Sequence, residues 1–168
     1  MNHERFSEVI LEISKHLKSA DLLVLEGLAY ICTFLRKKFE HYDWVGFYFA
    51  DLDNKMLHLK AYSGSPVEHH EIPFGKGICG QVAVSNQNFI VPDIRAQDNY
   101  LACNIAVKSE IVIPLFLEGK NIGQIDIDSH KINPFYDKDV HLLEAVCDLV
   151  AKTYSKSLYR LLSNKSKF

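Results

Sequence analysis

Residues 109–129, SEIVIPLFLEGKNIGQIDIDS, contain two apolar segments on either side of a glycine turn. The first segment, Ser109–Leu117, is almost continuously apolar, which predicts a strand covered on both faces. The second segment, Ile122–Ser129, alternates isoleucine with polar residues, so that Asp126 and Asp128 share one face of the returning strand. That polar face is either exposed to solvent or functional, and the pattern alone leaves both interpretations open.

Amphipathic helices are predicted on both sides of a group of strands. The predicted elements, in chain order, are helices over about residues 3–18 and 22–39, strands over 44–51 and 56–62, a short helix over 77–85, a strand over 89–92, the hairpin, and a final helix from about 137 to 161. Hairpin-connected strands between N- and C-terminal helices imply the α+β class with a central antiparallel sheet. We expect one domain over residues 1–168, with a core at about 22–154 and the helix over 3–18 packed on it.

Composition argues against several classes of function. The 168 residues carry a net charge of −2 and no basic stripe, so we expect no nucleic-acid partner. No apolar run approaches the roughly 20 residues of a membrane-spanning helix, and we expect no secretory signal at the N-terminus. Four widely spaced cysteines are typical of the reducing cytosol, so we expect a soluble cytoplasmic domain that binds no membrane.

The four cysteines fall into two groups. Cys32 and Cys147 lie on the apolar stripes of predicted helices, which predicts that both are buried and inert. Cys79 lies between glycines near the start of a short helix, where the helix field favours a thiolate. Cys103 lies in a predicted loop over residues 96–106, and loops of that length in compact domains are often functional. Cys79 and Cys103 are therefore the candidate reactive thiols.

The histidines near Cys79 do not form a metal-binding pattern. His69 and His70 are adjacent, so in an extended chain they point in opposite directions. A zinc site that combines one of them with Cys79 and Cys103 is conceivable, but the sequence has neither C-x-x-C nor H-x₃-H spacing. We expect no metal and no cofactor.

Three other residues are candidates for a binding site. Glu110 is an acid at the start of an apolar strand, where burial would raise its pKa. Trp44 and Tyr48 lie four positions apart in a predicted strand and therefore share a face. They are either ordinary core residues or an aromatic wall of a ligand pocket.

Four motifs together resemble a known family of enzymes. WVGFYF, GKGICG, ACN-x₄-SEIVIPL and IGQIDIDS are similar to motifs of the GAF-domain free methionine-(R)-sulfoxide reductases, over about residues 40–150. The resemblance implies a single GAF domain with a six-stranded antiparallel sheet. It also implies reduction of free methionine-(R)-sulfoxide with electrons from thioredoxin, and a homodimer formed through helices.

The resemblance also implies roles for individual residues. Cys103 would be the nucleophile and Cys79 its partner cysteine, while Glu110, Asp126 and Asp128 would engage the sulfoxide and the amino group, and Trp44 and Tyr48 would hold the methyl end. The sequence departs from the family pattern at His69, where many members have a third cysteine, and at Asn104, where an aspartate is frequent. Either Cys79 or an external thiol must then resolve the oxidised nucleophile.

The chemistry of sulfoxide reduction requires these residue types. A thiolate attacks sulfur, and a carboxylic acid that stays protonated near neutral pH supplies the proton for the departing oxygen. An alternative function is a non-catalytic GAF sensor that binds a small molecule and regulates a partner. A purely structural dimer module is a third interpretation, but it leaves Glu110, Asp126 and Asp128 without a role.

Overall fold

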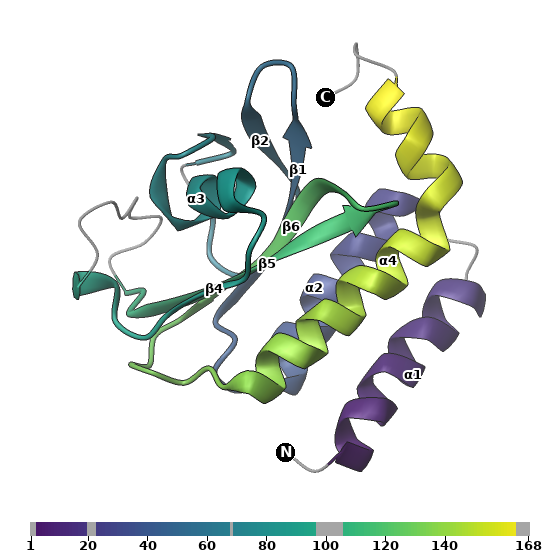
Figure 1. Cartoon of the computed structure of the whole chain (residues 1–168). Helices are drawn as coiled ribbons and strands as arrows, with labels where there is room; N and C mark the ends of the chain where they lie inside the picture. The colour runs from purple at the N-terminus through teal and green to yellow at the C-terminus, as the bar shows by residue number, and fades with distance from the viewer. Residues whose placement is uncertain (1–2, 20–22, 68, 97–105, 164–168) are drawn as a thin grey trace.

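The computed structural model describes residues 3–19, 23–67, 69–96 and 106–163 (Figure 1). Within these residues the elements are α1 (His3–Ser19), α2 (Val24–Lys38), β1 (Trp44–Asp51), β2 (Met56–Ser63), β3 (Glu71–Pro73), α3 (Gly77–Ser85), β4 (Phe89–Val91), a short 3₁₀ turn (Ile94–Ala96), β5 (Ser109–Leu117), β6 (Lys120–Ser129) and α4 (Asp137–Ser163). None of the described helices is both long and apolar enough to span a bilayer.

The described strands form one sheet in the order β3-β2-β1-β6-β5-β4. Every neighbouring pair in it is antiparallel. The predicted α+β class and the six-stranded antiparallel sheet are therefore confirmed. The predicted hairpin, β5 followed by β6, occupies two interior positions of the sheet, which explains why the first of these strands is apolar along almost its whole length.

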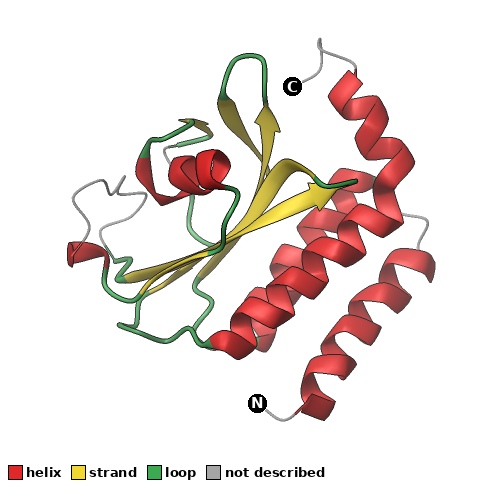
Figure 2. Cartoon of the chain, in the orientation of Figure 1, coloured by secondary structure: helices red, strands yellow, loops and turns green. Residues whose placement is uncertain are grey.

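The sheet separates two apolar clusters. Helices α2 and α4 cover one face, and α1 packs on the outer side of α4 (Figures 1 and 2). Helix α3 covers part of the other face. Because side chains alternate along a strand, Val45 and Phe47 of β1 enter the cluster of the long helices, whereas Trp44 and Tyr48 enter the cluster beneath α3.

Two of the cysteines belong to the cluster of the long helices. Cys32 on α2 and Cys147 on α4 are both buried, as predicted. Burial raises the pKa of each thiol well above its ordinary value, because a thiolate would lose its hydration there. Neither residue is therefore a source of thiolate in the folded protein.

The elements predicted from the residue pattern leave residues 71–73 outside any strand, so β3 was not among them. The structure instead pairs Glu71–Pro73 with the first residues of β2. Only Ile72 of this strand is buried, and the residues on either side of it are exposed. A three-residue strand contains too few positions for an alternating pattern to be recognised in the sequence.

Candidate active site

The pairing of three strands brings the predicted acids together on one face of the sheet. Asp128 of β6 is directly opposite Glu110 of β5 on one side and opposite Trp44 of β1 on the other. Two residues earlier in β6, Asp126 is opposite Gly46 of β1. Because residues two apart in a strand point the same way, these side chains all lie on the face that α3 covers.

The three acids are buried. The exposed fractions are 6% for Glu110, 4% for Asp126 and 5% for Asp128. The interpretation of Asp126 and Asp128 as a solvent-facing pair is therefore wrong. Helix α3 packs across β5 and β6 at this point and removes the two strands from water.

Helix α3 places Cys79 directly over the acids. Its first residue, Gly77, has φ of 64°, a conformation that favours glycine and that turns the chain into the helix. Two residues later, the Cys79 thiol donates to Oδ2 of Asp126 at 3.3 Å and approaches Oε1 of Glu110 at 3.8 Å. One thiol and two carboxyl groups thus share a site from which water is largely excluded.

Burial and mutual repulsion keep protons on these carboxyl groups. Burial, and then the charges of Asp126 and Asp128, raise the pKa of Glu110 well above its usual range. Burial, and then the charges of Asp126 and Asp43, likewise raise the pKa of Asp128. Burial raises the pKa of Asp126 to about 7, while its contacts with Cys79 and Glu110 oppose that rise. Asp126 is therefore the acid that ionises most readily, and Glu110 keeps its proton.

These shifts predict a pH-dependent stability that the Asp126→Asn variant lacks. Between its unfolded pKa of about 3.9 and its folded pKa of about 7, Asp126 binds more protons in the folded chain. The contribution of Asp126 to the stability of the fold is thus fully present below the unfolded pKa and is lost as the pH rises through the folded pKa. We expect the stability of Asp126→Asn relative to wild type to increase by roughly 1.4 kcal/mol per pH unit between about pH 4 and pH 7.

Urea denaturation of both proteins across this pH range measures the difference in unfolding free energy. Asp148 on α4 is exposed, so Asp148→Asn serves as the matched control and should keep a constant offset from wild type. A constant offset for Asp126→Asn as well would contradict the assignment of a raised pKa to this residue.

Trp44 and Tyr48 are core residues of the cluster beneath α3. The indole of Trp44 covers the backbone of Gly46, where a Cβ atom would collide with it, and stacks on Tyr62 with ring centroids 5.8 Å apart. The Tyr48 hydroxyl donates to the carbonyl oxygen of His69 at 3.2 Å. The indole Nε1 of Trp44 is buried and has no hydrogen-bond acceptor among the described residues. Trp44 is thus a core residue, and it also lines a cavity, so both of the roles considered for it in the sequence apply.

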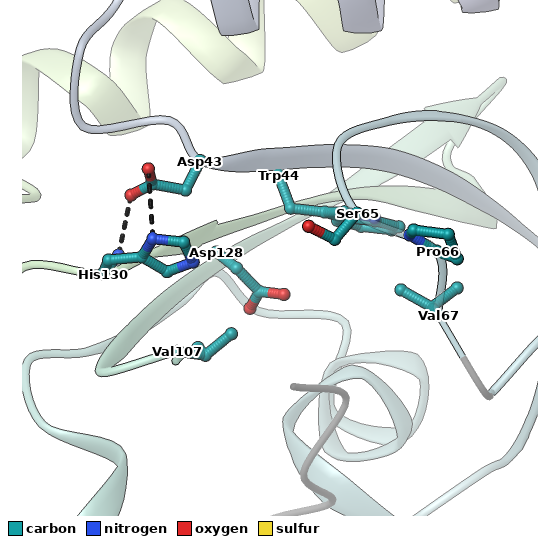
Figure 3. A pocket seen from close by; sticks show the side chains of 8 residues that line it. All are labelled: Asp43, Trp44, Ser65, Pro66, Val67, Val107, Asp128 and His130. Carbon is teal, nitrogen blue, oxygen red and sulfur yellow. Dashed lines mark hydrogen bonds and ion pairs between the residues drawn. The ribbon is translucent and has the colours of Figure 1, made fainter. Parts of the chain in front are cut away.

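That cavity lies beside Asp128 and is lined by Asp43, Trp44, residues 65–67 and His130 (Figure 3). The Asp43 carboxylate accepts the backbone N–H of His130 at 2.7 Å and pairs with Nδ1 of its ring at 3.4 Å. Sequence reasoning missed both residues, because the ends of β1 and β6 meet only once the strands pair. The pairing of β1 with β6 would have identified them, because Asp43 directly precedes β1 and His130 directly follows β6.

A second cavity lies beside the remaining acids and the thiol. It is lined by Cys79, Glu110 and Asp126 together with Lys76 and Ile72. The described residues thus bring together one of the two candidate thiols, all three acids and Trp44. Cys103 and Asn104 lie outside the described residues.

Comparisons with known proteins agree with this arrangement. A family model described as GAF domain matches residues 21–153. Free methionine-R-sulfoxide reductase of Escherichia coli (strain K12) is 29% identical over 160 residues, which are 95% of this chain and 95% of that protein. GAF domain-containing protein A of Dictyostelium discoideum is 35% identical over 126 residues, which are 75% of this chain and 78% of that protein.

The similar solved structures also include a free methionine-R-sulfoxide reductase. The X-ray structure of free methionine-R-sulfoxide reductase from Neisseria meningitidis, in complex with its substrate, matches with a TM-score of 0.84 and 30% identity. The match covers 92% of this chain and 91% of that chain. The chain therefore belongs to the GAF domain family and, within it, to the free methionine-R-sulfoxide reductases.

Proposed function

We propose that this protein reduces free L-methionine-(R)-sulfoxide to methionine by a thiol mechanism. The observation that supports the proposal most is the contact of the Cys79 thiol with two buried acids, one of which keeps its proton. A buried acid whose pKa is raised by its surroundings is suited to general acid catalysis near neutral pH. Two of the relatives named above are free methionine-R-sulfoxide reductases, which supports the same reaction for this chain.

The first step consumes one thiolate and one proton. The thiolate of Cys103 attacks the sulfoxide, whose oxygen passes to the attacking sulfur, and Glu110 supplies a proton to that oxygen. The products are methionine and a sulfenic acid on Cys103, so the substrate sulfur is reduced and the cysteine sulfur is oxidised by two electrons. Removal of the proton from Glu110 leaves a carboxylate that the solvent must reprotonate before the next turnover.

The second step regenerates the thiol. A second thiol condenses with the sulfenic acid, releases water and forms a disulfide, which the dithiol of thioredoxin then reduces. We assign Cys79 as that second thiol, because Cys32 and Cys147 are buried in the cluster of the long helices, on the opposite face of the sheet from the acids. His69 stands where many relatives carry a further cysteine, so the only alternative we retain is an external thiol that attacks Cys103 directly.

The remaining acids and aromatic residues bind the substrate in this proposal. Asp126 and Asp128 hold the ammonium group and the sulfoxide, and Trp44 and Tyr48 contact the methyl end. A negative charge shared among buried carboxyl groups attracts an ammonium ion, which favours a free amino acid over a peptide-linked residue. The cycle requires a reducing compartment, so we expect the protein to act in the cytoplasm, as a homodimer that associates through its helices.

A coupled assay tests the proposal. Wild-type protein with thioredoxin, its reductase and NADPH should consume NADPH with L-methionine-(R)-sulfoxide but not with the (S) diastereomer or with a peptide that contains the sulfoxide. Peptide mapping after turnover without thioredoxin should then detect a Cys79–Cys103 disulfide. Tight binding of the compound without NADPH consumption would instead support the sensor alternative.

A further inference from the structure

Three potential metal ligands meet under α3. Sγ of Cys79 lies 3.3 Å from Oδ2 of Asp126 and 3.8 Å from Oε1 of Glu110. The three ligand atoms all lie within 4.8 Å of one another, and all three residues are buried. This set contains no histidine, so it differs from the histidine-containing zinc site that the sequence left conceivable.

The spacing of these atoms fits a tetrahedral cation. Zinc binds thiolate sulfur at about 2.3 Å and carboxylate oxygen at about 2.0 Å, so a tetrahedral angle separates sulfur from oxygen by roughly 3.5 Å. The two observed distances, 3.3 Å and 3.8 Å, lie on either side of that value. Both sulfur–oxygen separations therefore match those around a tetrahedral cation to within a few tenths of an ångström.

A second observation, an unpartnered oxygen atom of Asp126, indicates that a bound group belongs at the same place. Oδ1 of Asp126 is buried and has no hydrogen-bond partner among the described residues, although the residue is only 4% exposed. A buried carboxylate oxygen without a partner is costly unless a cation or a donor occupies the adjacent space. The adjoining cavity, lined by Lys76, Gly77, Cys79, Glu110 and Asp126, provides that space and a path of entry.

The geometry points to a binding site for a thiophilic divalent cation, Zn²⁺, formed by Cys79, Glu110 and Asp126. A thiolate ligand selects zinc over magnesium or calcium, which prefer oxygen alone. Binding releases the thiol proton and the carboxyl protons to solvent, and three protein ligands leave one coordination position for water. Occupancy blocks the acids and the thiol, so the cation competes with substrate. Only this competition depends on the reductase function proposed above.

The site is tested by spectroscopy on a protein that cannot turn over. Cys103→Ser removes the other candidate thiol, and Co²⁺ then serves as the probe in place of Zn²⁺. We expect one equivalent of Co²⁺ to produce a sulfur-to-cobalt charge-transfer band and tetrahedral visible bands, and Zn²⁺ to abolish them. On this background Cys79→Ser should eliminate the charge-transfer band.

Further variants on the Cys103→Ser background distinguish the proposed ligands, Glu110 and Asp126, from the neighbouring acid Asp128. Glu110→Gln and Asp126→Asn should weaken Zn²⁺ binding at least about 10- to 100-fold, an effect as large as that of losing a supporting residue in other zinc sites. Asp128→Asn, which alters an acid on the same strand face but outside the ligand set, should leave the bands in place. Circular dichroism verifies that each variant is folded. A charge-transfer band that survives Cys79→Ser, or no band at all in the Cys103→Ser protein, would overturn the site.

Activity measurements test the competition separately. In wild type, Zn²⁺ should raise the apparent KM for L-methionine-(R)-sulfoxide and leave kcat unchanged. If kcat falls at constant KM, competition is refuted although the cobalt spectra still identify a site. If wild type has no reductase activity, the proposed function fails, and the spectra decide the metal site independently.

Discussion

Replacing Cys103 with serine is expected to lower thioredoxin-coupled turnover of L-methionine-(R)-sulfoxide by about 10³-fold or more. The reason is chemical: a serine hydroxyl is not ionised near neutral pH, and it is a far weaker nucleophile toward sulfur than a thiolate. The binding acids are unchanged in this variant, so it should still bind the substrate. NADPH consumption measures the turnover, and isothermal titration calorimetry measures the binding.

Replacing Cys79 with serine should have a different effect. If Cys79 resolves the sulfenic acid, this variant releases one equivalent of methionine in a single turnover and then stops, because thioredoxin has no disulfide to reduce. Cys32→Ala serves as a matched control, since it removes a thiol from the core on the opposite face of the sheet. Sustained turnover in Cys79→Ser would show that an external thiol resolves Cys103, and normal turnover in Cys103→Ser would exclude it as the nucleophile.

Replacing Glu110 with glutamine is expected to lower kcat by about 10²- to 10⁴-fold, the usual contribution of a general acid. Glutamine has nearly the same shape but no acidic proton, and the pKa of Glu110 is raised well above its ordinary value by burial and by its two acidic neighbours. Wild-type kcat should fall as the pH rises through the apparent pKa of the acid group, because the proton donor is then lost. The variant should lack that fall.

The control for this variant is Glu118→Gln, because Glu118 is an exposed acid at the turn that follows the same strand. It should keep wild-type kcat and the wild-type pH profile. If Glu110→Gln changes KM alone and retains the pH-dependent fall in kcat, Glu110 binds substrate but does not donate the proton. In that case Asp128, the other acid whose pKa is raised well above its ordinary value, becomes the candidate donor.

Sequence patterns were sufficient where local structure determines the outcome. The short helix expected over residues 77–85 is α3, because a glycine at each of several close positions permits the turn into a helix. The strand over Ser109–Leu117 is β5 with the same bounds, because a continuous apolar run of that length is typical of a strand with both faces covered. Glycine placement and apolar runs are local signals, and they need no knowledge of the partner strand.

The burial of the acids could not be predicted in the same way. Asp126 and Asp128 alternate with isoleucine as exposed residues of an edge would, and only the packing of α3 across β6 removes them from water. The same limit applies to Asp43 and His130, which are 87 residues apart in the chain and meet through the pairing of β1 with β6. The sixth strand came from the family resemblance, since Glu71–Pro73 is too short to carry a pattern.

The alternation of β5 between the two apolar clusters has an evolutionary consequence. Ile111, Ile113 and Leu115 anchor the long helices, while Glu110 and Val112 face α3. Mutations on the α3 side can therefore accumulate without disturbing the contacts that hold the long helices in place. In such a scaffold one face of the sheet packs against the long helices and the other forms the binding site. A few substitutions on the second face can therefore change the ligand, so enzymes and receptors can descend from a common ancestor with the same fold.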